Sequence, residues 1–308
     1  MQLGIDLGGT KTEVIVLNNS KEVFRHRVPS ARDSYEGSIQ TIRDLVFYAE
    51  EQVGEQCSIG MGMPGIISPL SGLAKNANST WLNGKPFDTD LSKAIGRKVR
   101  TTNDANCLAV SEAADGAGKD GNIVFAFILG TGSGSGIVVN GKVIDGHMGN
   151  GGEYGHIPLA WQDQYEFDNA PQCYCGHKGC YELWVSGTGF ERDYAHLSGQ
   201  KIKGTEITAL SQKGDETALK AIEGYKSRLG RAIAMITNIL DPDVFVLGGG
   251  MSNAPFIDDT ISDYVRPYVF GGEFQTPVRK AVHGDSSGVR GAAWLWTPAE
   301  LNEALKSY

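Results

Sequence analysis

One short pattern occurs twice in the chain: an apolar strand, a glycine-rich turn, and a second strand rich in β-branched residues. The first copy is MQLGIDLGGTKTEVIVLNN, and the second, roughly 120 residues later, is IVFAFILGTGSGSGIVVNG. Each copy predicts a β-hairpin whose tight turn needs residues that can adopt positive φ. Because the motif recurs once in each half, it indicates an internally duplicated chain.

Helices are predicted to alternate with strands along the rest of the chain. Residues 34–54 repeat apolar side chains at helical spacing, which predicts one buried face made of Ile39, Ile42, Leu45, Val46, Ala49 and Val53. Further helices are expected from Asp104, over about 215–240 and near 287–296, and the strand VFVLGGG follows the second of these. This alternation predicts an α/β fold, with a natural division at the small, polar segment 116–121.

Composition excludes several classes of protein. The chain has 308 residues and a formal net charge of −8, which argues against a broad nucleic-acid surface. Its longest apolar run, Ile123–Leu129, is far too short to cross a membrane. The N-terminus has neither the basic nor the apolar region of a secretion signal, so we expect a cytoplasmic protein.

Three glycine-rich turns, each after an apolar strand, are candidate phosphate sites. The usual P-loop pattern GxxxxGK[ST] is absent. Backbone N–H groups of glycine turns can form concave anion sites, and the hydroxyls of Thr10, Thr131 and Ser133 add donors. Any one turn alone could equally be a simple tight hairpin. Two such turns at matching points of a duplicated chain favour binding of nucleotide phosphate.

Three of the five cysteines, Cys173, Cys175 and Cys180, lie within eight residues. Together with a histidine they offer four ligands of the types that zinc prefers. A disulfide is the alternative, and a reducing compartment disfavours it. His156 and His177 are both available as the fourth ligand.

The motifs GIDLGGTK, NDAN, GTGSGSG, GExGH and CxCGxxGCxE, in that order, resemble the ROK family of sugar kinases and repressors, from Gly4 to about Trp296. The resemblance implies two actin-like (ribonuclease-H-like) ATPase domains with ATP in the cleft between them. We expect a small domain of residues 1–117 with a C-terminal helix over 288–308. The large domain, 118–287, would then carry the zinc-bearing loop.

The resemblance also implies roles for individual residues. Asp104 is expected to be the catalytic base, although at the start of a helix it could instead be an N-cap. Asp6 is expected near the Mg²⁺ that accompanies ATP. The sugar-binding residues would be Asn103, Asp104, Glu153, His156 and Glu182. The segment 76–84, with Asn78 and Trp81, is expected to form a further wall of the sugar site, although it could instead be a polar surface loop. The ATP-binding residues would be Gly4, Ile5, Asp6, Leu7, Gly8, Gly9, Thr10, Lys11, Gly130, Thr131, Gly132, Ser133, Gly134, Ser135, Gly136, Ile137, Gly249 and Gly250.

For the metal, the family pattern selects His156 together with Cys173, Cys175 and Cys180. Four protein ligands leave no open position, which predicts a structural Zn²⁺. Sixteen residues separate His156 from Cys173, more than the family commonly has, so the path of this loop is left open. Since few apolar residues lie between Asp163 and Cys173, we expect the loop to depend on the metal for its order.

The expected reaction is ATP-dependent phosphorylation of a hexose on its 6-hydroxyl. Among ROK members the chain resembles most closely the bacterial fructokinases (manno-fructokinases), through NANSTWLNGKPFD and DSSGVRGAAWLW, which predicts conversion of D-fructose to fructose 6-phosphate. The alternative is an N-acetylglucosamine kinase, which shares NDANC, GExGH and HGDxxGxRGAA. A sugar-sensing regulator is a third possibility, but ROK repressors carry an N-terminal helix-turn-helix for which the turn at Gly8 leaves no room. The family's usual assembly is a homodimer.

Overall fold

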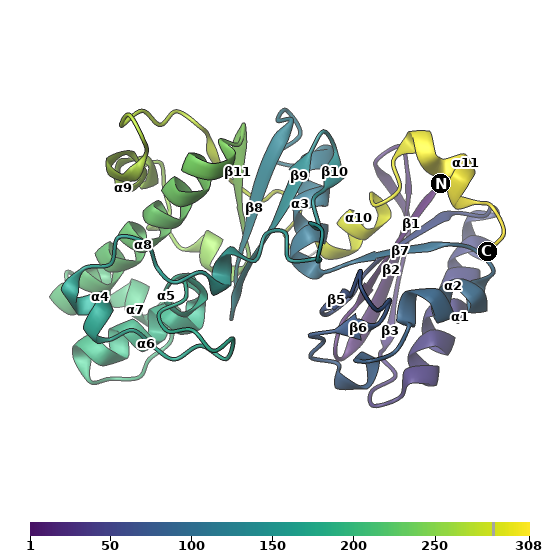
Figure 1. Ribbon diagram of the computed structural model, residues 1–308, viewed down its shortest axis with the longest axis horizontal. Coiled ribbons are helices and arrows are strands. Elements are labelled where there is room, and N and C mark those ends of the chain that lie inside the picture. Colours follow the sequence, from purple (N-terminus) through teal and green to yellow (C-terminus); the bar gives the residue numbers. More distant parts are fainter. Residues whose placement is uncertain (285–286) are drawn as a thin grey trace. The chain divides into compact units, whose positions relative to one another are not determined.

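The computed structural model describes residues 1–284 and 287–308, which form two compact units (Figure 1). The first unit contains residues 1–120, 136–151 and 282–308, and the second contains residues 121–135 and 152–281. Residues 136–151, expected in the second domain, therefore pack with the first unit. The predicted domain limits at 117/118 and 287/288 remain a prediction.

Each unit is built on a five-stranded sheet. The first has the order β3-β2-β1-β4-β7 and the second the order β10-β9-β8-β11-β12. The strands of the first are β1 (Gln2–Leu7), β2 (Lys11–Asn18), β3 (Lys21–Pro29), β4 (Ser58–Gly62) and β7 (Val99–Thr102). Those of the second are β8 (Ile123–Leu129), β9 (Ser133–Val139), β10 (Lys142–Val143), β11 (Val244–Gly248) and β12 (Val278–Lys280).

The two sheets follow the same path from strand to strand. In the first, β1 pairs antiparallel with β2 and parallel with β4. In the second, β11 runs parallel to both β8 and β12, and β10 pairs antiparallel with β9. This repeated order confirms the internal duplication and the actin-like α/β fold. A small third sheet joins β5 (Ile66–Ile67) to β6 (Ala74–Lys75).

Successive side chains of β2 pack on opposite faces of the first sheet. Val14 and Val16 belong to the core that α1 (Tyr35–Val53) covers, whereas Ile15 and Leu17 pack against α10 (Ser287–Ala293). The predicted apolar face of α1 is confirmed, with its N-cap at Ser34. α2 (Phe87–Ile95) packs beside α1, and α3 (Asp104–Asp115) packs on α10.

Glycines allow α10 to lie directly on the sheet. A Cβ on Gly4 would be 2.1 Å from the carbonyl oxygen of Val289, and a Cβ on Gly60 would be 1.9 Å from that of Ala292. These distances are far inside van der Waals contact, so backbone packs on backbone at both positions. Gly4, predicted to bind ATP, is therefore required by packing.

The segment predicted as one C-terminal helix, 288–308, is interrupted. α10 ends at Ala293, and two short helices follow, η6 (Pro298–Glu300) and α11 (Leu301–Ala304). Pro298 lacks a backbone N–H and disfavours helix at the preceding residue, and Thr297 instead starts the new helix with a capping box. Asp285 and Ser286, part of the motifs HGDxxGxRGAA and DSSGVRGAAWLW, lie outside the described residues.

The second unit is organised around α8 (Glu216–Leu240), which packs against α5 (Glu182–Val185), α6 (Gly187–Ser198), α7 (Gly204–Ser211) and α9 (Ile261–Val265). The predicted helix over 215–240 is confirmed: Asp215 caps its N-terminus and Asp241 ends it with a φ of 44°. Other short helices are η1 (Thr80–Leu82) in the first unit and η2 (Tyr154–His156), α4 (Gln164–Asp168), η3 (Gly250–Asn253) and η4 (Arg266–Tyr268) in the second. In the described part of the chain, no helix combines the length and the apolar character that spanning a bilayer requires.

Candidate active site

The first two glycine turns have an unexpected conformation. Both are fully described, and none of their glycines has a left-handed φ, so the predicted reason for these glycines is wrong. Gly8 and Gly132 are instead places of close approach, whereas Gly9 has open space around it. A Cβ would be 2.7 Å from the Lys11 carbonyl oxygen at Gly8, and 2.7 Å from a carboxylate oxygen of Glu182 at Gly132. Only the third turn needs the left-handed region, at Gly249, with a φ of 79°.

The residues predicted to bind ATP differ in exposure. Gly9, Thr10, Lys11, Thr131, Gly249 and Gly250 are exposed at the tips of the three turns. Gly4, Ile5, Leu7 and Gly136 are buried within the first unit. The buried members can only fix the strands that carry the turns, whereas the exposed ones can reach a ligand.

Asp6 lies at the end of β1, directly opposite Glu13 on β2. Burial, the charge of Asp104 and the charge of Glu13 raise the pKa of Asp6 to about 6, and Arg27 opposes them. Arg25 and Arg27 both form ion pairs with Glu13, at 2.7 Å. Among the described residues Asp6 has no ion-pair partner, so its carboxylate lacks a compensating cation.

At the start of α3, the alternative that Asp104 is an N-cap is wrong. Asn103 is the N-cap, since its side-chain oxygen accepts the N–H of Asn106 at 2.7 Å. Asp104 is the first residue of the helix, and its Oδ1 accepts the N–H of Ala105 at 2.9 Å. Asp104 is exposed. The N-cap role therefore belongs to Asn103, and the Asp104 side chain is open to solvent.

Asp145 is a polar residue beside this helix that the sequence did not indicate. Its Oδ1 accepts hydrogen bonds from Thr102, at 3.1 Å, and from the side-chain amide of Asn106, at 2.9 Å. Partial burial raises the pKa of Asp145, although both hydrogen bonds act in the opposite direction. No motif marks this residue, because it reaches α3 from a loop 39 positions further along the chain.

In the second unit, Glu182 contacts the second glycine turn. Its Oε2 accepts the N–H of Ser133 at 3.1 Å. Tyr154, from the GExGH motif, shares a hydrogen bond with the Ser133 hydroxyl. A Cβ on Gly155 would be 2.3 Å from the Ser133 carbonyl oxygen, which explains the glycine of that motif. The Ser133 hydroxyl, expected to help bind phosphate, and the N–H of the same residue are thus both hydrogen-bonded within the protein.

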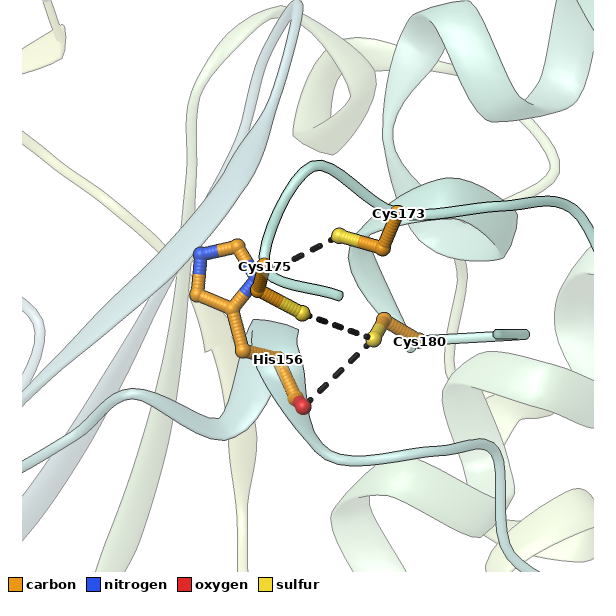
Figure 2. A group of neighbouring side chains, drawn as sticks. All are labelled: His156, Cys173, Cys175 and Cys180. Atoms are coloured by element: carbon orange, nitrogen blue, oxygen red, sulfur yellow. Dashed lines mark hydrogen bonds between the residues drawn. The ribbon is translucent and has the colours of Figure 1, made fainter. Parts of the chain in front are cut away.

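The four predicted metal ligands converge (Figure 2). One ligand atom from each of His156, Cys173, Cys175 and Cys180 lies within 4.8 Å of the others. Nδ1 of His156 is 3.6 Å from Sγ of Cys173, and the sulfurs of Cys175 and Cys180 are 3.6 Å apart. A tetrahedral site with Zn–S bonds of about 2.3 Å would have edges of about 3.8 Å. The donor types and their spacing fit such a site.

Two residues next to this cluster, Tyr174 and His177, are hydrogen-bonded to residues of the cluster. The hydroxyl of Tyr174, between two of the cysteines, is 2.9 Å from Nε2 of His156, a contact that the sequence did not indicate. This leaves Nδ1 for a metal and fixes the ring orientation. His177 contributes its carbonyl oxygen, which accepts the N–H of Cys173 at 2.8 Å, and its side chain is not part of the cluster.

The path of the loop after His156 is now defined. Residues 157–160 run antiparallel to residues 179–181. We call these two paired segments the loop ladder. In it the N–H of Tyr181 donates to the Ile157 carbonyl at 2.9 Å, and that of Leu159 donates to Gly179 at 2.8 Å. α4 then begins with a capping box between Asp163 and Glu166. The loop thus has secondary structure of its own, which sequence analysis did not anticipate.

Two residues expected to line a sugar site differ from each other. Asn78 is exposed. The indole N–H of Trp81 donates to the Ser38 hydroxyl at 3.1 Å, and its ring packs on the core of the first unit. Trp81 is therefore a packing residue. An open cavity of about 510 Å³ also lies in the first unit, beside β7, but none of the predicted site residues lines it.

The family model described as "ROK family" matches residues 2–299. The chain belongs to the ROK family. It is 40% identical to the N-acetyl-D-glucosamine kinase of Haemophilus influenzae over 96% of this chain and 99% of that relative. It is 38% identical, with the same coverage, to the N-acetyl-D-glucosamine kinase of Escherichia coli. With this family, fold and set of relatives, the protein is a ROK sugar kinase.

Solved structures agree with the fold of this ROK sugar kinase. The ROK hexokinase of Thermus thermophilus superposes with a TM-score of 0.85 at 30% identity, covering 96% of this chain and 97% of the other. A ROK glucokinase of Streptomyces griseus, in complex with glucose and AMPPNP, gives 0.70 at 26% identity, covering 95% and 97%. The two relatives from Haemophilus influenzae and Escherichia coli are N-acetyl-D-glucosamine kinases, and none of the four proteins described here is named a fructokinase.

Proposed function

We propose that this ROK sugar kinase transfers the γ-phosphoryl group of ATP to the 6-hydroxyl of N-acetylglucosamine. The observation that carries the proposal is the 40% identity to a curated N-acetyl-D-glucosamine kinase over 96% of the chain. Seven further curated relatives of the same name have 37–38% identity over the same share. The fructokinase alternative rests on two segments only. In one of these segments Trp81 packs on the core, which makes a role of this residue in selecting the sugar less favoured.

In this proposal Asp104 accepts the proton of the sugar hydroxyl as that oxygen attacks phosphorus. Asn103 caps the helix and so holds Asp104 at the first helical position. Because phosphoryl transfer passes through a loose transition state, positioning of the hydroxyl contributes more than basicity. Glu153, His156, Glu182 and Asn78 are proposed to hydrogen-bond the remaining hydroxyls.

The exposed tips of the three glycine turns are proposed to hold ATP, with Asp6 facing its Mg²⁺. A partly buried carboxylate with a raised pKa and two acidic neighbours is a group to which a cation would add favourable charge. Bound with ATP, Mg²⁺ neutralises charge that develops on the phosphates. Lys11, exposed at the end of the first turn, can add a second positive charge.

The cluster of His156, Cys173, Cys175 and Cys180 is proposed to hold one structural Zn²⁺. The four donors leave no open coordination position, so the metal would supply order and no reaction step. Burial raises the pKa of the Cys180 thiol to about 12, so metal binding there would have to displace a proton.

The identity of the sugar is tested by steady-state turnover of the purified protein with ATP. The panel is N-acetylglucosamine, N-acetylmannosamine, glucose, mannose and fructose. We expect kcat/KM for N-acetylglucosamine to exceed that for fructose at least tenfold, which corresponds to about 1.4 kcal/mol. A tenfold preference for fructose would reject the proposal and restore the fructokinase interpretation.

The metal is tested by elemental analysis of wild type and two variants. We expect one zinc per chain in wild type, loss of zinc and of thermal stability in Cys175→Ser, and no change in His177→Ala, whose side chain lies outside the cluster. Sugar KM should rise in Cys175→Ser because His156 and the segment before Glu182 lose their common anchor. Fully active protein without zinc would contradict this role.

A further inference from the structure

Four charged side chains are buried together beside the loop ladder. Glu166 and Asp193 are each 2% exposed at their side chains, and Arg228 and Arg231 are each 4% exposed. Two carboxylates and two guanidinium groups give this group, which we call the charge cluster, no net charge. Such burial is tolerated only with good geometry and satisfied hydrogen bonds.

Glu166 is the centre of the charge cluster. Its Oε1 accepts from Arg228 at 2.8 Å and from Arg231, and its Oε2 accepts from Arg231 at 2.7 Å and from the N–H of Asp163 at 3.2 Å. Burial alone would raise the pKa of Glu166, but Arg231 and Arg228 outweigh it and lower the pKa. A capping residue of the short helix α4 is thereby fixed to two arginines of the long helix α8.

The two arginines make further hydrogen bonds to different parts of the second unit. Arg228 donates to Asp193 on α6 at 2.6 Å. Arg231 donates to the carbonyl oxygens of Ala160 at 3.2 Å and Trp161 at 2.8 Å, at the end of the loop ladder. Of the two arginines, only Arg231 is hydrogen-bonded to the backbone of the ladder, at Ala160.

The ladder carries two proposed sugar residues at its other end. His156 immediately precedes Ile157, and Glu182 immediately follows Tyr181, and these two ladder residues are hydrogen-bonded through their backbones. The Tyr181 hydroxyl also accepts the N–H of Ala160 at 3.2 Å, so Ala160 is held from both sides. A shift of residues 160–161 would therefore be transmitted along the ladder to both His156 and Glu182.

We propose that Arg231 is a positioning residue for sugar binding, which anchors the loop ladder to α8 independently of the metal cluster. The inference rests on the proposed sugar-binding roles of His156 and Glu182. It gives the loop two separate anchors. The cysteines hold one part of it, residues 173–180 with His156, and Arg231 with Glu166 holds another, residues 160–166.

The test compares Arg231→Lys with Arg228→Lys. Each replacement keeps the buried positive charge on α8. Each also exchanges a guanidinium group that binds Glu166 for the shorter lysine side chain. Only Arg231→Lys removes hydrogen bonds to Ala160 and Trp161. We expect it to raise the KM of the sugar about tenfold, with the KM of ATP and the zinc content per chain within twofold of wild type. Arg228→Lys should lower Tm by a similar amount and change the KM of the sugar less than threefold.

Equal increases in the KM of the sugar in both variants would reduce Arg231 to general structural support and overturn the proposal. So would an unchanged KM in Arg231→Lys. The measurement uses whichever hexose the wild type phosphorylates best, so rejection of N-acetylglucosamine as the substrate leaves it readable.

Should either lysine variant fail to fold, paired replacements give the same comparison. Glu166→Gln with Arg231→Met removes one charge of each sign and leaves Asp193 paired with Arg228. Asp193→Asn with Arg228→Met is its mirror image and leaves Glu166 paired with Arg231. The KM of the sugar should rise in the first pair and not in the second, and the reverse order would overturn the proposal.

Discussion

Two groups of carboxylates in this kinase, one in each unit, have opposite electrostatic surroundings. In the second unit Glu166 is surrounded by guanidinium groups, which lower its pKa. In the first unit Asp6 faces Asp104 and Glu13, and its pKa is raised to about 6. Glu166 has two arginine partners, whereas Asp6 has no ion-pair partner among the residues that the structure describes.

The contrast separates stability from function. A buried carboxylate held by two arginines contributes to the fold because its charge is already compensated. A partly buried carboxylate beside two others costs stability, and such costs are characteristic of sites prepared for a charged ligand. We therefore propose that the charge of Asp6 serves ligand binding, whereas that of Glu166 holds the loop in place.

Replacement of Asp104 by Asn should have the largest effect on the first group. It keeps the size of the side chain and removes its ability to accept a proton, so kcat should fall by about 10²–10⁴ with little change in the KM of the sugar. Steady-state kinetics on the preferred hexose measure this. A variant that keeps more than a tenth of wild-type kcat would show that Asp104 is not the base.

Glu166→Gln should have the largest effect on the second group. It leaves Arg228 and Arg231 buried with only Asp193 to compensate them, and breaking a buried pair costs about 3–5 kcal/mol of unfolding free energy. Chemical denaturation measures the loss. Asp263→Asn, which removes an exposed ion pair with Arg266, is the control and should cost at most about 1 kcal/mol. Equal losses in the two variants would erase the distinction.

Asp6→Asn should change stability in the opposite direction. Because the folded-state pKa of Asp6 lies above its ordinary value, the folded protein binds this proton more tightly than the unfolded chain does. The stability that protonation provides is therefore present below about pH 4 and lost as pH rises to about 6. In the absence of ATP and Mg²⁺, Asp6→Asn should raise Tm at pH 8 and leave it unchanged at pH 4, while activity is lost. A lower Tm at pH 8 would indicate that Asp6 is compensated after all.

The sequence predicted the first group better than the second. Asp6 and Asp104 lie in short motifs next to a strand and a helix, so local pattern and family resemblance were enough to find them. Glu166, Asp193, Arg228 and Arg231 come from three separate helices, and no local pattern indicates that they meet. The path after His156 was left open for the same reason, since Arg231 reaches the loop from 65 positions beyond Glu166.

The glycine turns show a second limit of the sequence. Their strands and position were predicted correctly, and the duplicated sheet order confirms them. The reason for the glycines was not, because Gly132 is set by Glu182 and Gly136 by α3, both distant in the chain. Composition reveals that a side chain is absent, whereas only the fold shows what occupies the space.

The smallest expected effect concerns the ion pair between Glu300 and Arg100. It differs from both groups, because Glu300 has an arginine partner but the pair is partly exposed. Glu300 accepts from Arg100 at 2.9 and 3.0 Å and from Thr297, and these bonds lower the pKa of Glu300 to about 2. Its folded-state pKa is depressed, so its contribution is present above the ordinary pKa and lost as pH falls from about 4.5 toward 2. The pair is partly exposed and therefore screened, so Glu300→Gln should cost no more than about 1 kcal/mol at pH 7 and nothing at pH 2. Thermal melts at 20 mM and 500 mM salt measure it, with Glu303→Gln on the next turn as the control. A loss as large as that of Glu166→Gln would mean that bidentate geometry, and not burial, decides what a paired carboxylate contributes in this fold.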